Sequence, residues 1–249
     1  MSMAIYDEEV AAEFALTIVL NGEEFATMVC SPSDLEELLI GFLASEGIIR
    51  WTKEIKDISI DETMGFAYVE TYKTLDLSQQ DYSKRVIGSC CGKSRQFYFK
   101  SDVKTAKTIT SNLSLSVGRC YDLMRQLQTN SDQFKRTGGV HNAALAATNE
   151  LLTVYTDIGR HNALDKVYGY ILKERITVKD KLIVFSGRVS SEVLLKISKI
   201  GAGIILSKSA PTDLALRLAD ELGITVIGFA RGYKLNIYTH PQRILEANR

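Results

Sequence analysis

The chain has 249 residues, of which 45% are apolar and 24% are charged. Its 30 basic and 30 acidic residues cancel, so the formal net charge at pH 7 is zero. This composition is typical of a globular protein with a substantial core and argues against a disordered chain. Because the net charge is zero, we expect neither nucleic acid nor a membrane surface as a partner, and an anionic ligand must be captured by local groups.

No apolar run approaches the roughly 20 residues that a helix needs to cross a bilayer. The first ten residues contain Asp7, Glu8 and Glu9 instead of the basic residues that open a signal peptide, so we expect a cytoplasmic protein. The four cysteines do not indicate a disulfide framework in a chain of this size. Cys30 ends a strand-like run and Cys120 lies on an apolar helical stripe, so both are predicted to be unreactive packing residues.

Residues 1–80 are predicted to form a small α+β domain. Two strand-like runs between Phe14 and Cys30 flank Asn21-Gly22, a strong signal for a hairpin turn. The segment from Ser31 to Asp34 then predicts the start of a helix, with a capping oxygen and a proline at a permitted early position. The later elements expected here are the helix to about Ala44 and the strands Ile55–Ile60 and Phe66–Tyr72.

Residues 81–110 are predicted to be a mobile cysteine loop and linker, and residues 111–249 a larger α/β domain. After a helical stripe between Leu113 and Leu127, strands alternate with helices, which predicts a mostly parallel sheet covered on both faces. The expected strands are 143–147, 151–155, 182–185, 203–207 and 224–229, and the expected helices are 162–173, 190–200 and 212–222.

Polar loops follow the strands of this second domain. In open α/β sheets, ligands bind at the carboxyl ends of the strands, where helix N-termini favour anions. Each loop contains a cation that could contact phosphate, and arginine offers it paired donors. Although polar glycine-rich loops are ordinary features of such sheets, four together favour a phosphate or polyanion site. The cations are Arg160, Arg188, Lys208 and Arg231, in loops 157–161, 186–190, 207–211 and 229–234.

The loop Gly88–Ser94 reads G-S-C-C-G-K-S and approaches a nucleotide-binding P-loop without matching it. The first glycine of that motif would fall on Ile87, and the residues after Ser94 are aromatic and strand-like instead of helical. A nucleotide-binding enzyme that uses this loop is therefore the weakest of the functional alternatives.

Adjacent cysteines in a glycine-flanked loop suggest thiol chemistry. The thiolate is the reactive form, and a nearby cation such as Lys93 favours it. One thiol of Cys90-Cys91 could hold a transferred sulfur while the other attacks or shields it. Cys91 is favoured as the carrier because Lys93 is closer to it in sequence, and Cys90 stays the alternative.

Two of the three histidines, His141 and His161, occur in loops that contain glycine, so we interpret them as candidate site residues. A zinc deaminase would need H-x-E followed by P-C-x-x-C, and the chain has neither, so no bound zinc is expected. The run Gly201-Ala202-Gly203 lacks the third glycine of a dinucleotide-binding fingerprint and precedes a strand.

Taken together, these segments resemble the FdhD family, sulfurtransferase accessory proteins that mature molybdenum-dependent formate dehydrogenases. The likeness covers nearly the whole chain. The matching stretches are Ser45–Ile49, Thr137–His141, Asp157–His161, Leu164–Lys166, Ser186–Arg188, Ser209–Thr212, and Gly228-Phe229 through Tyr238–Arg243.

The resemblance implies a cytidine-deaminase-like three-layer sandwich without its metal, a homodimer, and an enzyme that acts through a cysteine persulfide. A cysteine desulfurase would load the sulfur, which would pass to Mo-bis(molybdopterin guanine dinucleotide) for the catalytic subunit of formate dehydrogenase. Well-studied members carry C-x-x-C where this chain has Cys90-Cys91. The alternative is a chaperone that binds the cofactor while its cysteines are incidental.

By the same resemblance, guanine nucleotide (GDP) would be a partial mimic of the cofactor. The family's cofactor-contacting segment falls on Phe229, Ala230, Arg231, Gly232, Tyr233 and Lys234. Arg160, His161, Arg188, Lys208 and His141 complete the expected cofactor site.

Overall fold

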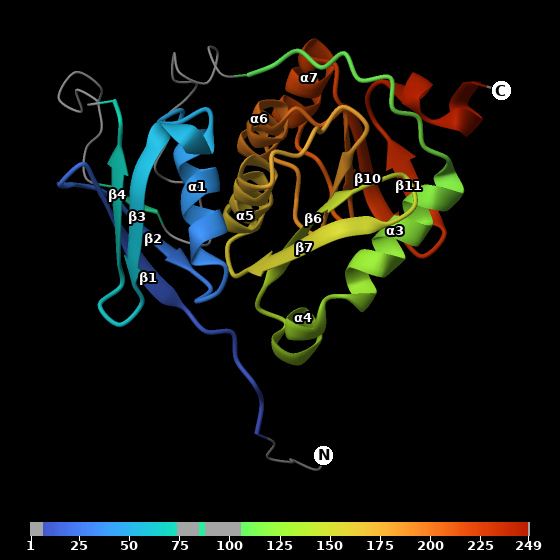
Figure 1. Cartoon of the computed structure of the whole chain (residues 1–249). Coiled ribbons are helices and arrows are strands. Elements are labelled where there is room, and N and C mark those ends of the chain that lie inside the picture. Colours follow the sequence, from blue (N-terminus) through green and yellow to red (C-terminus); the bar gives the residue numbers. More distant parts are fainter. Residues whose placement is uncertain (1–6, 74–84, 88–105, 249) are drawn as a thin grey trace.

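The computed structural model describes residues 7–73, 85–87 and 106–248. Within these ranges the chain forms two β-sheets with helices between and beside them (Figure 1). A smaller first unit contains one sheet and one α-helix, and a larger second unit contains the other sheet and the remaining α-helices. The predicted α/β class with a small N-terminal α+β unit is confirmed.

The first unit begins with the predicted hairpin. Asn21 and Gly22 have φ values of 50° and 88°, the left-handed conformations that a tight two-residue hairpin turn requires. Alternate residues of the first strand, Leu16, Ile18 and Leu20, are fully buried beneath the helix. The elements are β1 (Phe14–Leu20), β2 (Glu23–Cys30), α1 (Leu35–Ser45), the 3₁₀ turn η1 (Thr52–Glu54), β3 (Ile55–Asp61) and β4 (Phe66–Thr71).

Helix α1 starts later than the sequence suggests. Its N-cap is Asp34, which has a φ of 52° and makes no side-chain capping hydrogen bond. The helix does follow the Ser31–Asp34 segment as predicted, with acids in its first turn, but Pro32 lies before the helix instead of at an early helical position. Ser31 instead serves a long-range contact: its hydroxyl accepts a hydrogen bond from the backbone N–H of Ile158 at 3.1 Å.

A short strand that the sequence did not predict extends the first sheet. Strand β5 (Arg85–Ile87) pairs in parallel with β2, with Ile87 opposite Met28. The order of this sheet is β3-β4-β1-β2-β5. The chain thus returns to the edge of the first sheet immediately before the segment that contains the paired cysteines.

The second sheet has the order β11-β10-β9-β8-β6-β7. Strands β7 to β10 run in one direction, while β6 and β11 run in the other. The prediction that most strands of this sheet run parallel is confirmed. Its strands are β6 (His141–Ala146), β7 (Leu151–Asp157), β8 (Leu182–Phe185), β9 (Ile204–Ser207), β10 (Thr225–Arg231) and β11 (Lys234–Ile237).

Helices cover both faces of this sheet, as predicted. One face packs against α5, α6 and α7, and the other packs against α3 (Figure 1). Strand β8 shows the consequence, because all four of its side chains are buried. The helices are α3 (Val117–Thr129), α4 (Asp132–Thr137), α5 (Arg160–Lys173), α6 (Ser191–Ile200) and α7 (Asp213–Leu222), followed by the 3₁₀ turns η2 (Pro241–Arg243) and η3 (Leu245–Asn248).

The two units meet where α1 crosses α5. A Cβ atom on Gly41 would lie 1.8 Å from the carbonyl oxygen of Asp165, and one on Gly169 would lie 1.9 Å from that of Glu37. Only glycine allows two helix backbones to approach this closely. Lys173 closes the junction through an ion pair to Glu37 at 2.9 Å. Among the helices that the structure describes, none is long and apolar enough to span a membrane.

Candidate functional site

The predicted loops gather at one edge of the second sheet. Strands β7 to β10 all end there, and β6 begins there, because His141 pairs with Asp157 and Ala143 pairs with Phe185. We call this edge, made by loops 157–161, 186–190, 207–211 and 229–234 with His141, the rim. The expectation that the carboxyl ends of the strands place these loops together is confirmed.

Each loop of the rim contacts the next. A Cβ on Gly187 would lie 3.3 Å from Cβ of Arg160, so the second loop touches the start of α5. Ser207 donates a hydrogen bond from its hydroxyl to the carbonyl of Gly187 at 2.8 Å. The backbone N–H of Phe229 donates to the carbonyl of Ser209 at 3.1 Å. The rim is thus one connected surface.

Lys208 and Arg231 form the best-defined pair of cations on the rim. Nε of Arg231 donates a hydrogen bond to the backbone carbonyl of Lys208 at 2.9 Å. Among the described residues, no carboxylate forms an ion pair with either side chain, and the same is true of the exposed Arg188. Their charges are therefore available to an anion.

The segment from Phe229 to Lys234 forms the end of β10 and the turn into β11. Phe229 has a φ of 52°, which is unusual for a bulky residue, and Gly232 supplies the left-handed turn with a φ of 56°. Ala230 is buried, whereas Tyr233 is 88% exposed. The carbonyl of Tyr233 accepts a hydrogen bond from the hydroxyl of Tyr121 at 2.8 Å, which holds the turn against α3.

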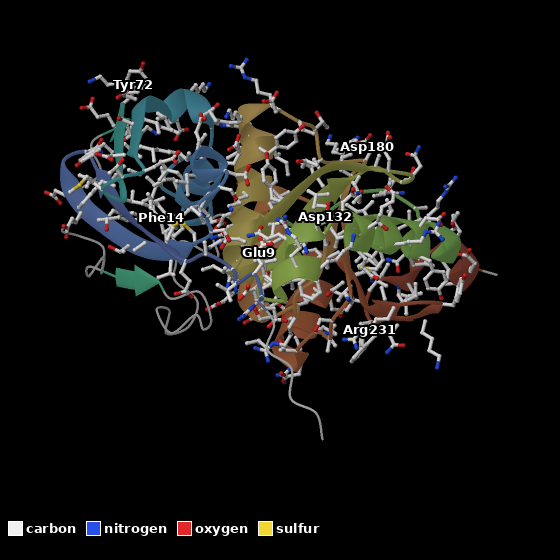
Figure 2. All side chains as sticks on the ribbon, turned by 90° about the horizontal axis from the view of Figure 1, so that it is seen from below. Glu9, Phe14, Tyr72, Asp132, Asp180 and Arg231 are labelled. Atoms are coloured by element: carbon white, nitrogen blue, oxygen red, sulfur yellow. The ribbon has the colours of Figure 1, made fainter. Side chains whose placement is uncertain are left out.

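The side chain of Arg231 reaches the surface of the second unit, as Figure 2 shows from below. Tyr72, which is labelled in the same view, lies at the far side of the first unit. The cationic end of the rim is therefore remote from the outer strands of the first sheet.

His161 is the most electrostatically perturbed histidine of the rim. Burial, followed by the positive charges of Lys196 and Arg160 and by His141, lowers the pKa of His161 to about 3. Its imidazole is therefore neutral at pH 7. The enclosed Nε2 lies 3.3 Å from Oε2 of Glu192 without the alignment of a hydrogen bond.

The pKa of His141 is shifted in the same direction as that of His161. Burial lowers the pKa of His141, and the neighbouring Arg160 lowers it further, while Asp157 acts in the opposite direction. Both histidines are thus disfavoured as cations, so they would serve an anionic ligand as neutral hydrogen-bonding groups.

Behind the histidines lies a fully buried ion pair, Asp157 with Lys166, at 2.9 Å. Asp157 also accepts a hydrogen bond from the backbone N–H of Ser31 at 3.1 Å. The pair joins the end of β7 to the middle of α5, and the Ser31 contact connects it to the residue that follows β2 in the first unit. It fixes where the rim lies relative to the first sheet.

The cysteines divide into two pairs. Cys90 and Cys91, the predicted sulfur carriers, lie outside the described residues, as does the whole Gly88–Ser94 loop. Cys30 and Cys120 are fully buried, and burial raises the pKa of each thiol to about 12. The prediction that these two are packing residues is confirmed. The described residues contain no group of three or more His, Cys, Asp or Glu side chains that could hold a metal ion.

The structure adds two residues that the sequence interpretation missed. Glu192 of α6 approaches His161, and Phe134 of α4 lies beneath the ammonium group of Lys208, with Nζ 5.6 Å from the ring centroid. Neither belongs to a recognisable motif. The only sequence signal for Glu192 was its place in the first turn of a predicted helix, two residues after a predicted loop, and Phe134 gave none.

Comparison with known proteins supports the resemblance. The model of the FdhD/NarQ family matches residues 11–245. The chain is 59% identical to the sulfur carrier protein FdhD of Bacillus licheniformis over 96% of this chain and 90% of that protein. It is 60% identical to the protein of that name from Geobacillus kaustophilus over 96% of this chain and 91% of the relative.

A solved structure agrees with the fold. The putative formate dehydrogenase accessory protein from Desulfotalea psychrophila superposes with a TM-score of 0.78 at 29% identity. The match covers 96% of this chain and 92% of that one, so it includes both units. A family model that spans both sheets, together with relatives of this similarity over nearly their whole length, establishes that the chain belongs to the FdhD/NarQ family.

Proposed function

We propose that this protein is a sulfur carrier that accepts persulfide sulfur from a cysteine desulfurase and transfers it to Mo-bis(molybdopterin guanine dinucleotide) before the cofactor enters formate dehydrogenase. Cys91 is the proposed carrier, with Cys90 as the alternative. The names of the relatives, sulfur carrier protein FdhD, support the carrier role. The observation on which the cofactor assignment depends is the Lys208–Arg231 pair, whose charges no described carboxylate neutralises.

Loading requires only thiol–persulfide exchange. The carrier thiolate attacks the outer sulfur of the desulfurase persulfide and forms a new S–S bond, while the donor cysteine leaves as a thiolate. Electrons balance without an added oxidant, because the sulfane sulfur moves between two thiols. The buried Cys30 and Cys120 are poor candidates for this step, since the raised pKa of each leaves almost no thiolate at pH 7.

The covalent chain supports delivery to the rim. Ile87 pairs with Met28 at the edge of the first sheet. Cys90 and Cys91 follow Ile87 by three and four residues, so the chain allows their Cα atoms no more than about 11 and 14 Å from that of Ile87. From Met28 the chain runs through the end of β2 to Ser31, which contacts Asp157 and Ile158 at the start of the rim. The position of Ile87, the last described residue before the cysteines, supports the proposal that they can reach the end of the rim that holds Arg160 and His161.

The rim suits the acceptor because each guanine dinucleotide arm carries a diphosphate. Arginine offers several N–H donors in a fixed plane, and lysine adds a compact charge. We assign phosphate contacts to Arg160, Arg188, Lys208 and Arg231. The neutral His141 and His161 would donate or accept hydrogen bonds to uncharged parts of the cofactor.

Mass spectrometry tests the carrier role directly. The protein is incubated with a purified cysteine desulfurase and cysteine, and its mass is measured without reductant. A carrier gains about 32 Da, the mass of one sulfur atom, as a persulfide. Cys91→Ala is expected to abolish this gain and Cys90→Ala to retain it.

The opposite result for the two variants would reassign the sulfur to Cys90. A wild-type protein that gains no sulfur but binds guanine nucleotide would instead be a cofactor-binding chaperone. Formate dehydrogenase activation in cells provides the second readout, and full activation by the Cys91→Ala variant would remove Cys91 from the mechanism.

A further inference from the structure

Aromatic rings, not carboxylates, hold the two central cations of the rim. Nζ of Lys208 lies 5.6 Å from the ring centroid of Phe134, and the guanidinium carbon of Arg231 lies 5.8 Å from that of Phe229. The two rings are 40% and 39% exposed. Because Arg231 also donates to the carbonyl of Lys208, the two aromatic–cation contacts are joined into one unit.

This arrangement differs from that of other cations in the described chain. Lys196 forms an ion pair with Asp165 at 2.5 Å, and Arg217 forms one with Asp213 at 2.8 Å. A carboxylate restrains a cation and also cancels its charge. A ring attracts the cation through its quadrupole and leaves the net charge in place. Lys208 and Arg231 are therefore restrained while the positive potential between them is preserved.

The backbone keeps Phe229 in the conformation that this contact needs. The hydrogen bond from its backbone N–H to the carbonyl of Ser209 stabilises its φ of 52°. The preceding Gly228 leaves little room for a side chain, because a Cβ would lie 3.1 Å from both that carbonyl oxygen and Cδ of Pro211. Strained bulky residues of this kind persist where surrounding contacts fix them, and they concentrate at ligand sites.

We propose that Phe134 is a positioning residue of the diphosphate site: its ring holds the ammonium group of Lys208 beside Arg231, so that both cations meet one nucleoside diphosphate. This inference rests on the proposed function for the identity of the ligand. It adds helix α4 to the site, an element that contributes none of the expected cofactor contacts.

Calorimetry with GDP tests this role. Replacing the ring in Phe134→Leu should weaken GDP binding roughly two- to fivefold, the effect of losing one exposed cation–π contact. Phe134→Tyr keeps the ring and should restore wild-type affinity. Tyr68→Leu is the matched control, because Tyr68 is 48% exposed on the first sheet, and it should leave the affinity unchanged.

A double-mutant cycle separates positioning from a general structural effect. If Phe134 acts through Lys208, then Phe134→Leu should cost affinity in the wild-type background and almost none in a Lys208→Met background. Additive losses, or a Phe134→Leu variant that binds GDP like the wild type, overturn the inference. If Phe134→Leu does not fold, the test uses Phe134→Tyr alone and the double variant Phe134→Tyr/Lys208→Met. A loss of GDP affinity in Phe134→Tyr, which keeps the ring, refutes the role of the ring.

Failure of this inference is distinguishable from failure of the proposed function. Wild-type binding that is insensitive to Phe134 refutes the positioning role alone. A wild-type protein that does not bind GDP refutes the nucleotide part of the proposed function and the positioning role with it.

Discussion

Nζ of Lys166 lies 2.9 Å from Oδ2 of Asp157, and neither side chain is exposed to solvent. Lysine is rarely buried this completely without a partner. Lys166 also donates to the backbone carbonyl of Thr156 at 2.9 Å, and Asp157 accepts from the backbone N–H of Gly159 at 2.8 Å. Through these contacts the pair holds together the end of β7, the helix α5 and, by way of Ser31, the residue after β2.

Removing one partner should be costly. Lys166→Met leaves the Asp157 carboxylate buried without its counter-ion, and we expect the free energy of unfolding to fall by about 3–5 kcal/mol. Urea denaturation followed by circular dichroism measures this change. Lys56→Met is the control, because it removes a lysine from the exposed pair with Glu70 and should leave the midpoint near that of the wild type. Equal midpoints for the two variants would contradict a structural role for the buried pair.

The glycines of the α1–α5 crossing should not tolerate alanine. In Gly41→Ala the new methyl group meets the backbone carbonyl of Asp165, which no side-chain rotation can relieve. We expect a loss of about 3 kcal/mol or more in thermal or urea unfolding.

Gly118→Ala serves as the opposite control for this prediction. Gly118 is the second residue of α3, and the atom nearest to an added Cβ would be the hydroxyl oxygen of Ser116 at 3.9 Å. Alanine there should stabilise the protein by about 0.5–1 kcal/mol. Stabilisation by both substitutions would show that the helices are not in backbone contact.

Acid should destabilise the fold partly through His161. The pKa of His161 is about 3 in the folded protein and about 6.5 when unfolded, so between these values only the unfolded state binds the proton. Its contribution to stability is complete above pH 6.5 and is lost progressively as the pH falls toward 3. At pH 5 the loss should be about 2 kcal/mol.

The measurement compares wild type with His161→Gln by urea unfolding at pH 7.5 and at pH 5. Glutamine cannot take up a proton, so the variant should lose less stability over this interval. Identical pH dependence in the two proteins would show that His161 is not buried as a neutral ring.

Arg231 should dominate the affinity for guanine nucleotide. Arg231→Ala removes a charged donor whose charge no described carboxylate cancels, and we expect GDP to bind about tenfold more weakly or worse. Arg217→Ala is a matched control, because Arg217 is exposed on α7 and paired with Asp213. Calorimetry at two salt concentrations should show the larger salt dependence for the wild type. Unchanged affinity in Arg231→Ala would remove the β10–β11 turn from the site.

Local patterns predicted most of the fold. Asn21-Gly22 determined the first hairpin because few residues accept two successive left-handed conformations. The apolar run at 182–185 predicted a strand buried on both faces, and the structure contains it with the same bounds. The rim was predictable as well, since strands that run in one direction must end at one edge.

Long-range contacts were not predictable in the same way. The three residues of β5 are too few to show a periodic pattern, and their pairing with β2 depends on segments far apart in the sequence. Ser31 has the local features of a helix cap, yet its hydroxyl and N–H are used by residues more than 120 positions away. Phe134 could not be predicted as a site residue, because only the folded structure places the ammonium group of Lys208 over its ring.

The crossing at Gly41 and Gly169 has a consequence for any attempt to divide the protein. We expect that neither unit folds on its own. Separating them would expose the packed faces of α1 and α5 and would remove the hydrogen bond from Ser31 to Asp157. Unfolding should accordingly occur as a single cooperative event. The first sheet and the cationic rim would then fold and unfold together.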